Sequence, residues 1–252
     1  MLRSPPADGA TNMATDHALV VRAARTGEGV LRVYSWAAPT LSLGRNQRTR
    51  GSYDLDAIAA RGIAVVRRPT GGRAILHHRE LTYSVAAPAP PGEPLARTYA
   101  RLNAIVIDTL RRLGVDARLA TRSAPALAPG LTPCFDAPAP GEVEWPGRKL
   151  AGSAQWRDRG ALLQHGSILI DDDQATLAAL ASEATAPGPI PATLREAMGR
   201  APTPTEFADA LADAAAAAFG ATPEALSADS PEAQPEAALA RLYRDDNWTW
   251  RR

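Results

Sequence analysis

The sequence reads Ile63-Ala64-Val65-Val66-Arg67-Arg68-Pro69-Thr70-Gly71-Gly72-Arg73-Ala74-Ile75-Leu76-His77 across a turn between two apolar runs. A β-branched run that enters a glycine loop and an apolar run that leaves it are typical of two joined strands. Paired glycines let backbone N–H groups approach a ligand closely, and flanking arginines favour a phosphate or carboxylate. The loop lacks the Gly-Lys-Ser/Thr of a P-loop and the dinucleotide fingerprint. A charged β-turn without a ligand is an equally good interpretation.

Outward from this loop, the N-terminal half alternates short helices and strands. Hydrophobic periodicity and turn residues predict helices over 12–21, 53–61 and 94–113, and strands over 30–36, 40–43, 63–66, 73–76 and 80–86. The helix over 94–113 is the clearest, because apolar residues recur every three or four positions between a starting proline and Gly114.

The C-terminal half begins with a Pro- and Ala-rich loop over 123–140, and loops of that length in a compact domain are usually functional or disordered. Strands are predicted over 142–145, 149–157 and 161–171, the last two joined as a hairpin at 158–160. After Gln174 the sequence becomes alanine-rich and helical, with breaks at prolines. Strands followed by helices indicate the α+β class. We expect a catalytic domain over 12–185 and a helical C-terminal extension over 186–252 that packs on it.

Composition excludes several classes of protein. The 252 residues are 45% hydrophobic and 22% charged with a net charge of +1, as in an ordinary globular protein. No run of like charges offers a nucleic-acid footprint, and no apolar stretch is long enough to span a membrane or to form a secretion signal. We therefore expect a cytoplasmic monomer that binds neither nucleic acid nor membrane.

Lysine is used once. Of the 28 basic residues only Lys149 is a lysine, so 27 are arginines. An ammonium group is a compact charge that can move a proton, whereas a guanidinium stays charged. Lys149 lies in Gly147-Arg148-Lys149-Leu150-Ala151-Gly152-Ser153-Ala154-Gln155, and the hairpin partner carries Leu163-Gln164-His165-Gly166-Ser167. Pairing of these two strands would bring Lys149, His165 and the backbone of the glycines together at one rim of the hairpin. A solvated Lys149 and a hydrogen-bonded core His165 are the alternative.

The chain also has a single cysteine, Cys134, in Thr132-Pro133-Cys134-Phe135-Asp136. A free thiol has a pKa near ~8.5 and becomes a good nucleophile when a nearby cation stabilises the thiolate. Lys149 or a histidine could supply that cation. A buried structural cysteine is the alternative, although a loop bounded by prolines is a poor place for core packing.

Together these motifs resemble the biotin/lipoate protein ligase family. The segments that carry the resemblance span about residues 12–172 in order: 44–47 (Gly-Arg-Asn-Gln), 67–77, 80–84 (Glu-Leu-Thr-Tyr-Ser), 147–155 and 163–167. Within the family, Cys134-Phe135 matches the Cys-Phe pair of the cysteine-dependent octanoyltransferases. The ATP-using ligases have an Asn-Asp pair at the same position. The resemblance implies a mixed sheet packed by helices, of the kind shared with class II aminoacyl-tRNA synthetases, and an acyl tunnel under the glycine loop.

The resemblance also implies roles for individual residues. Cys134 would carry the acyl group as a thioester, and Lys149 would lie near the acyl carbonyl. Substrate-binding positions would be Arg68, Gly71, Gly72, Arg73, His77, Gly152, Ser153, Gln155, His165 and Gly166. His78 departs from the family pattern, which more often has Asp there, and this puts an orienting hydrogen bond in question.

The implied reaction moves octanoyl from acyl carrier protein through Cys134 to the acceptor lysine of a lipoyl domain, in a 2-oxoacid dehydrogenase or the glycine cleavage H protein. It needs no metal and no cofactor. Three alternatives stay open: a ligase that uses ATP and Mg²⁺ with free acid, an amidotransferase between lipoyl domains, and an inactive module that only binds acylated proteins.

Overall fold

The computed structural model describes residues 1–120, 141–183, 188–235 and 237–252. In that part of the chain the strands form two sheets. The larger sheet has the order β1 (Leu2–Arg3), β2 (Val30–Tyr34), β6 (Glu80–Pro88), β10 (Ala161–Leu169), β9 (Lys149–Asp158), β8 (Val143–Glu144) and β7 (Arg118–Leu119). The smaller has the order β4 (Ala64–Arg67), β3 (Thr40–Leu43) and β5 (Ile75–His77).

The centre of the large sheet is the antiparallel set β6, β10 and β9. Gly166 lies opposite Tyr83 on β6 and opposite Ser153 on β9. The β9–β10 hairpin turns at Arg159 and Gly160, which both have positive φ, 48° and 81°, as a two-residue hairpin turn requires. This register decides which side chains of β10 point to each face of the sheet.

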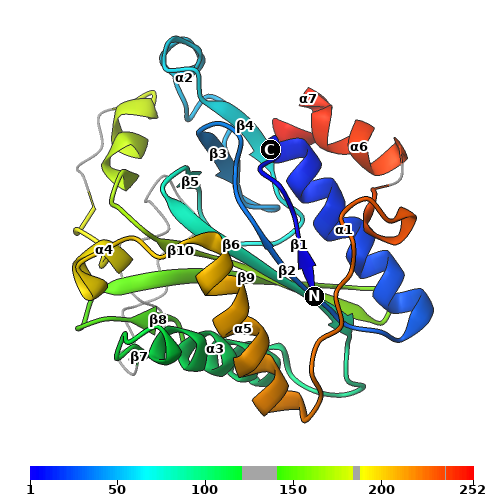
Figure 1. Cartoon of the computed structure of the whole chain (residues 1–252). Helices are drawn as coiled ribbons and strands as arrows, with labels where there is room; N and C mark the ends of the chain where they lie inside the picture. Colours follow the sequence, from blue (N-terminus) through cyan, green and yellow to red (C-terminus); the bar gives the residue numbers. More distant parts are fainter. Residues whose placement is uncertain (121–140, 184–187, 236) are drawn as a thin grey trace.

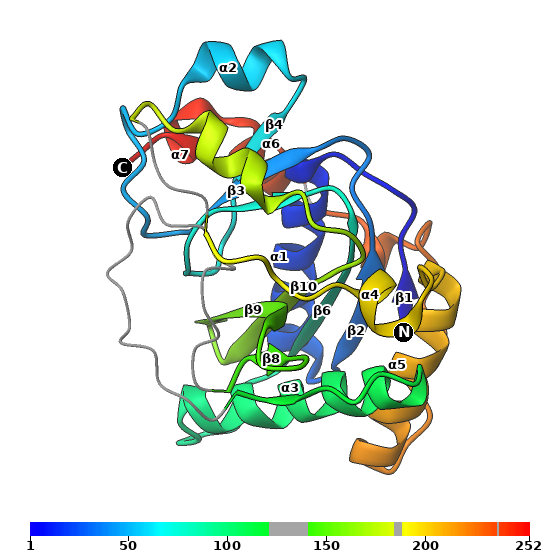
Figure 2. The same cartoon turned by 90° about the vertical axis from the view of Figure 1, so that its left-hand side faces the viewer.

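Three long helices cover the large sheet (Figure 1). Helices α3 (Leu95–Arg112) and α5 (Pro204–Phe219) pack against each other on one face, and α1 (Gly9–Thr26) contacts β2, β6 and β10 on the other. Turned by 90°, the molecule shows α3 running below β8 and β9 (Figure 2). The small sheet lies on the same side as α1, which contacts β4.

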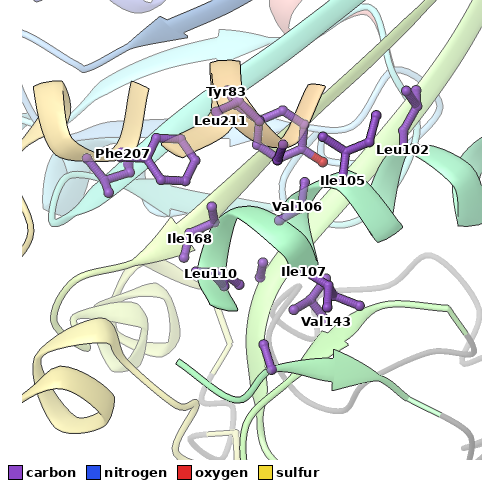
Figure 3. Packing of buried hydrophobic residues seen from close by; sticks show 14 of the residues in the cluster. Tyr83, Leu102, Ile105, Val106, Ile107, Leu110, Val143, Ile168, Phe207 and Leu211 are labelled. Carbon is purple, nitrogen blue, oxygen red and sulfur yellow. The ribbon is translucent and has the colours of Figure 1, made fainter. Parts of the chain in front are cut away.

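The main hydrophobic core lies between the large sheet and helices α3 and α5. Figure 3 shows Val106 and Leu110 of α3 meeting Phe207 and Leu211 of α5 beside Tyr83 of the sheet, all at most 1% exposed. Each such aliphatic side chain contributes about 1.5–3 kcal/mol by burial. This core also encloses a polar contact, because Gln164 of β10 donates to Asn103 of α3 at 2.8 Å. The next residue of β10, His165, points to the opposite face and to Asp16 of α1.

The remaining helices are short. They are α2 (Leu55–Ala60), η1 (Gln174–Leu180), α4 (Leu194–Met198), η2 (Pro231–Ala233), α6 (Ala237–Arg244) and α7 (Asp246–Thr249), where η marks a 3-10 helix. Helix α6 packs along α1, and α7 contacts β4 (Figure 1). No helix in the described ranges is long and apolar enough to cross a bilayer.

The α+β prediction is confirmed, and so is the hairpin at 158–160. The helix expected over 12–21 is longer at both ends, because Asp8 caps its first turn and Gly27 its last. Strands β1 and β7 were not predicted, since two residues carry no periodicity. Leu95 belongs to the apolar repeat that predicted the helix over 94–113, but it is 49% exposed. The expected division at 185/186 stays a prediction, and the expected loop over 123–140 lies outside the described residues.

Candidate active site

Arg68, which is 4% exposed, supports the glycine loop of residues 69–73. Its guanidinium donates to the carbonyl oxygens of Gly71 and Arg73, at 2.8 and 2.7 Å, and to that of Ser42 on β3 at 2.9 Å. Three carbonyls that would otherwise repel one another are thus gathered around one cation. Arg68 therefore fixes the shape of the loop, a role that the sequence did not separate from ligand binding.

The loop is also packed against the segment that follows β3. An added Cβ on Gly44 would lie 1.9 Å from the Gly72 carbonyl oxygen, so only glycine fits there. The Arg45 amide donates to the Thr70 carbonyl at 2.8 Å, and Gly72 itself has φ of 94°. The two segments that matched the family pattern are therefore one structural unit.

His165 of β10 connects this unit to helix α1. Its Nε2 lies 2.6 Å from the Thr70 hydroxyl and its Nδ1 lies 3.1 Å from Asp16 Oδ2. Burial lowers the pKa of His165, so the ring is neutral. Because a carboxylate only accepts, Nδ1 carries the proton, and Nε2 accepts from Thr70.

Asp16 is wholly buried and collects four donors. Oδ1 accepts from Arg32 and Ser84 at 2.8 and 2.7 Å, and Oδ2 accepts from Tyr34 and His165 at 3.0 and 3.1 Å. Burial acts to raise the pKa of Asp16, but the Arg32 guanidinium and these hydrogen bonds hold it below its ordinary value. A buried carboxylate with this set of partners anchors α1, the sheet and the glycine loop to one point.

A second buried carboxylate, Glu80, orients His77. Glu80 Oε1 accepts from His77 Nδ1 at 2.7 Å and from the hydroxyls of Thr82 and Ser167 at 2.6 and 2.7 Å. The His77 ring stacks on Trp36 with centroids 3.9 Å apart and planes 8° from parallel. The ring is thus fixed in plane and tautomer, and Glu80, three residues on, supplies the orienting acceptor.

His78, the residue that departs from the family pattern, pairs through its side chain with Asp173 and not with His77. It is exposed, and its Nδ1 lies 3.0 Å from Asp173 Oδ2 beside helix η1. The Asp that the family more often has here is therefore not needed to orient His77.

Lys149 begins strand β9 and is 3% exposed. Its Nζ donates to Glu142 Oε1 at 2.7 Å. A buried ammonium next to a carboxylate keeps a fixed position, so Glu142 sets where the lysine charge lies. Along β9 the residue opposite His165, Ala154, is five positions further, or about 16 Å. Lys149 of β9 and His165 of β10 are therefore well apart along the sheet, and the expectation that strand pairing brings them to one rim is wrong.

The other predicted positions lie where β9 and β10 pair. Gly166 admits no side chain, since a Cβ would meet Tyr83 Cε1 at 2.6 Å and Ser153 Oγ at 2.7 Å. The Tyr83 hydroxyl lies 2.8 Å from Ser153 Oγ and accepts from Gln164 at 2.9 Å. The Gln155 amide lies 2.8 Å from Gln164 Oε1. Gly152 is buried, and its carbonyl faces Gly166.

Cys134 lies outside the residues that the structure describes. Arg73 is half-buried and follows the two glycines, with its carbonyl bound by Arg68. Among the described residues no group of three or more His, Asp or Glu could hold a metal ion.

Residues 8–216 match the model of the lipoyl protein ligase A/B catalytic domain. The chain belongs to this family. Relatives in the lipoyl protein ligase A/B family include the octanoyltransferase LipM of Kyrpidia tusciae, 37% identical over all of this chain and 98% of that protein. The octanoyltransferase LipM of Symbiobacterium thermophilum is 39% identical over 97% of this chain and 95% of its own.

Solved structures of the family share the fold. The bi-partite lipoate protein ligase of Thermoplasma acidophilum has a TM-score of 0.77 at 21% identity, over 99% of this chain and 94% of that one. Lipoate-protein ligase A bound with ATP has a TM-score of 0.73 at 21% identity, over 99% and 96%.

Sequence reasoning missed the carboxylates Asp16, Glu80 and Glu142. A signal for Asp16 exists, because helical spacing places this acidic residue on the same face as the apolar Met13, Leu19 and Val20. Glu142 has none, since its distance from Lys149 depends on the β8–β9 turn.

Proposed function

We propose that this chain is an octanoyltransferase of protein lipoylation. The observation that carries the proposal is the match to octanoyltransferases named LipM over nearly the whole of both chains. The buried lysine held by a carboxylate and the rigid glycine loop agree with acyl transfer.

The reaction would run in two steps. The Cys134 thiolate attacks the thioester carbonyl of octanoyl-carrier protein, a C–S bond forms to the enzyme, and the carrier thiolate leaves. The amine of the acceptor lysine then attacks the enzyme thioester, an amide forms and the C–S bond to Cys134 breaks. The departing thiolate of Cys134 takes up the proton that the amine loses. The thioester keeps the acyl group activated, so the reaction needs no ATP.

Lys149 would act in both steps. Its ammonium would stabilise the thiolates and the oxyanion of each tetrahedral intermediate. Glu142 would be the positioning residue, because it fixes the ammonium at 2.7 Å. The backbone around Gly71 and Gly72 and the oriented ring of His77 would form walls for the acyl chain.

The acceptor would be the lysine of a lipoyl domain, in a 2-oxoacid dehydrogenase or the glycine cleavage H protein. A fold neighbour, the Thermoplasma acidophilum lipoate protein ligase, was studied with its E2 lipoyl domain. We propose that the reaction takes place in the cytoplasm and that the enzyme acts as a monomer.

Mass spectrometry of the enzyme after mixing with octanoyl-carrier protein tests the mechanism. We expect one octanoyl adduct, located on Cys134, that disappears when a lipoyl domain is added. Cys134→Ala should form no adduct and transfer nothing. Transfer at an unchanged rate by Cys134→Ala would exclude the thioester.

The same assay separates the alternative activities. Transfer from free octanoate that depends on ATP and Mg²⁺ would identify a ligase. Faster transfer from an octanoylated lipoyl domain than from carrier protein would identify an amidotransferase. Binding without turnover from any of these donors would identify an inactive module.

The role of Glu142 is tested by paired substitutions. We expect Glu142→Ala to lower kcat by roughly tenfold or more, since the lysine charge loses its fixed position. Glu144→Ala is the matched control, because Glu144 lies two residues away on β8. Equal kcat values for the two variants would remove Glu142 from the mechanism.

A further inference from the structure

Five arginines gather where the C-terminal segment meets the loop after β3. We call Arg45, Arg48, Arg50, Arg251 and Arg252 the arginine cluster. The amides of Thr49 and Arg50 donate to the Arg252 carbonyl at 3.0 and 2.9 Å, and the Arg251 guanidinium donates to the Arg45 carbonyl at 2.6 Å. Segments about 200 residues apart in the sequence, 206 for Arg45 and Arg251, thus form one basic surface.

The positive charge of the arginine cluster is not neutralised within the described part of the chain. Several exposed arginines elsewhere have an acidic partner within 4.0 Å, namely Arg3, Arg112, Arg195, Arg200 and Arg244. None of the five cluster arginines has such a partner among the described residues, although Asp245 and Asp246 precede Arg251 closely in sequence. A surface that keeps like charges together without counter-charges is suited to bind an anion.

Two tryptophans hold part of the cluster in place. The Arg251 guanidinium carbon lies 3.9 Å from the Trp248 ring centroid, and that of Arg45 lies 5.3 Å from Trp156 and 5.7 Å from Trp248. Burial and the neighbouring Arg45 and Arg252 lower the pKa of Arg251, and its Nε is buried with no partner among the described residues. Guanidinium groups stacked in this way are pre-organised for the two-point recognition of phosphate or carboxylate.

The cluster adjoins the glycine loop. The Arg45 amide binds the Thr70 carbonyl, and Gly44 packs on Gly72. A ligand held by these arginines would therefore lie beside the loop that the acyl group is proposed to occupy.

We propose that the arginine cluster is the docking surface for the acyl donor, where it holds the phosphodiester of the phosphopantetheine arm and acidic side chains of the carrier protein. This inference rests on the proposed function, in which the donor is octanoyl-carrier protein. The donor is favoured over the acceptor because a phosphodiester matches a guanidinium fork, and a lysine-bearing lipoyl domain has no phosphate of its own.

The experiment compares two double variants with equal loss of charge. Arg48→Gln/Arg50→Gln removes two exposed cluster arginines, and Arg25→Gln/Arg111→Gln removes two exposed arginines on α1 and α3. We expect the first variant to raise KM for octanoyl-carrier protein by roughly fivefold or more, to leave kcat within about twofold, and to weaken the salt dependence of KM. The control should match the unmodified protein.

Two small acyl donors show which anionic group of the carrier protein the arginine cluster binds. Octanoyl-pantetheine has neither phosphate nor carrier protein, so its KM should be equal in all variants. A raised KM for octanoyl-phosphopantetheine assigns the cluster to the phosphate, and a raised KM with intact carrier protein alone assigns it to the acidic protein surface; either supports the docking surface.

The inference fails if the cluster variant keeps the unmodified KM for octanoyl-carrier protein, or if only the KM for the lipoyl domain rises. Failure of the proposed function looks different, because the unmodified enzyme itself would then transfer nothing from octanoyl-carrier protein.

Discussion

Thr70 is the residue through which the glycine loop reaches the buried network of Asp16. Its hydroxyl donates to His165 Nε2 over 2.6 Å, and the residue is 1% exposed. We expect Thr70→Val to destabilise the fold by about 1–3 kcal/mol, because it leaves a buried acceptor unpaired. Thr70→Ser keeps the hydroxyl and should cost about 1 kcal/mol or less. Denaturant unfolding of both variants measures this, and equal losses would show that the methyl group matters and the hydroxyl does not.

His165 makes stability depend on pH. Burial lowers its pKa below the ordinary value of 6.5, so below that pH the unfolded chain binds a proton that the folded protein does not. The free energy of unfolding should therefore fall as pH drops from 7 to 5. Asp16 adds to the loss only below its ordinary value of 3.8, since its pKa is lowered too.

His165→Gln isolates this contribution. The variant lacks the titrating ring, so its free energy of unfolding should fall less between pH 7 and 5 than that of the unmodified protein. His17, whose pKa is also lowered by burial, stays in both proteins and cancels in the difference. Parallel pH profiles for the two proteins would contradict the prediction.

At this scale the sequence predicted residues but not their partners. Lys149 and His165 stand in motifs with a recognisable order, so they could be named in advance. Their acceptors, Glu142 and Asp16, come from other elements, and the distance of 2.7 Å between Lys149 and Glu142 exists only once β8 and β9 have paired. A hydrogen-bond partner that depends on tertiary structure leaves no local pattern.

Among elements, the glycine loop offers a test that separates folding from binding. A Cβ on Gly71 would meet nothing within 4 Å, and its φ is not in the left-handed region. Gly71→Ala should therefore fold with stability within about 1 kcal/mol of the unmodified protein and raise KM for the acyl donor. Calorimetry measures the stability of the variant, and transfer kinetics measure its KM for the acyl donor.

Gly44→Ala is the contrasting variant in the same unit. Its Cβ would lie 1.9 Å from the Gly72 carbonyl oxygen, so loop and support must separate. We expect a loss of at least about 2 kcal/mol, with transfer impaired as well. A stable but inactive Gly44→Ala would mean that the loop moves without strain.

Elements with strong local signals were predicted well. The strands β2, β3 and β6 and helix α3 begin and end within about two residues of their sequence-based bounds. The separation of β3, β4 and β5 into their own sheet was not predicted, because strand partners are chosen by tertiary packing and not by the alternation of side chains.

On the scale of the whole molecule, the C-terminal segment stabilises the base of the site. Arg67 is wholly buried, and its guanidinium donates to the Thr249 carbonyl at 2.7 Å and the Gln47 carbonyl at 2.9 Å. The Trp248 indole donates to the Arg67 carbonyl at 2.8 Å. Burial, followed by Arg251 and Arg252, lowers the pKa of Arg67 to about 10.

Deleting residues 246–252 should therefore destabilise the protein by at least about 3 kcal/mol, because a buried guanidinium loses a partner and the tryptophan packing goes with it. Chemical denaturation of the truncated and full chains measures the difference. Trp248→Phe, which keeps the ring but not the N–H, should lose only about 0.5–1.5 kcal/mol. A truncated chain as stable as the full one would show that the segment merely lies on the surface.

The contact between Arg67 and Thr249 also has a consequence for the order of folding. It joins residues 182 positions apart, so it forms late, after local helices and the β9–β10 hairpin. A chain still being synthesised would lack this support of the glycine loop until Thr249 has been added. In stopped-flow refolding, tryptophan fluorescence should report α7 docking as a slower phase than hairpin formation, and the ability to accept an acyl group should appear with that slower phase. Catalytic competence would then mark a chain that has been made and folded through α7.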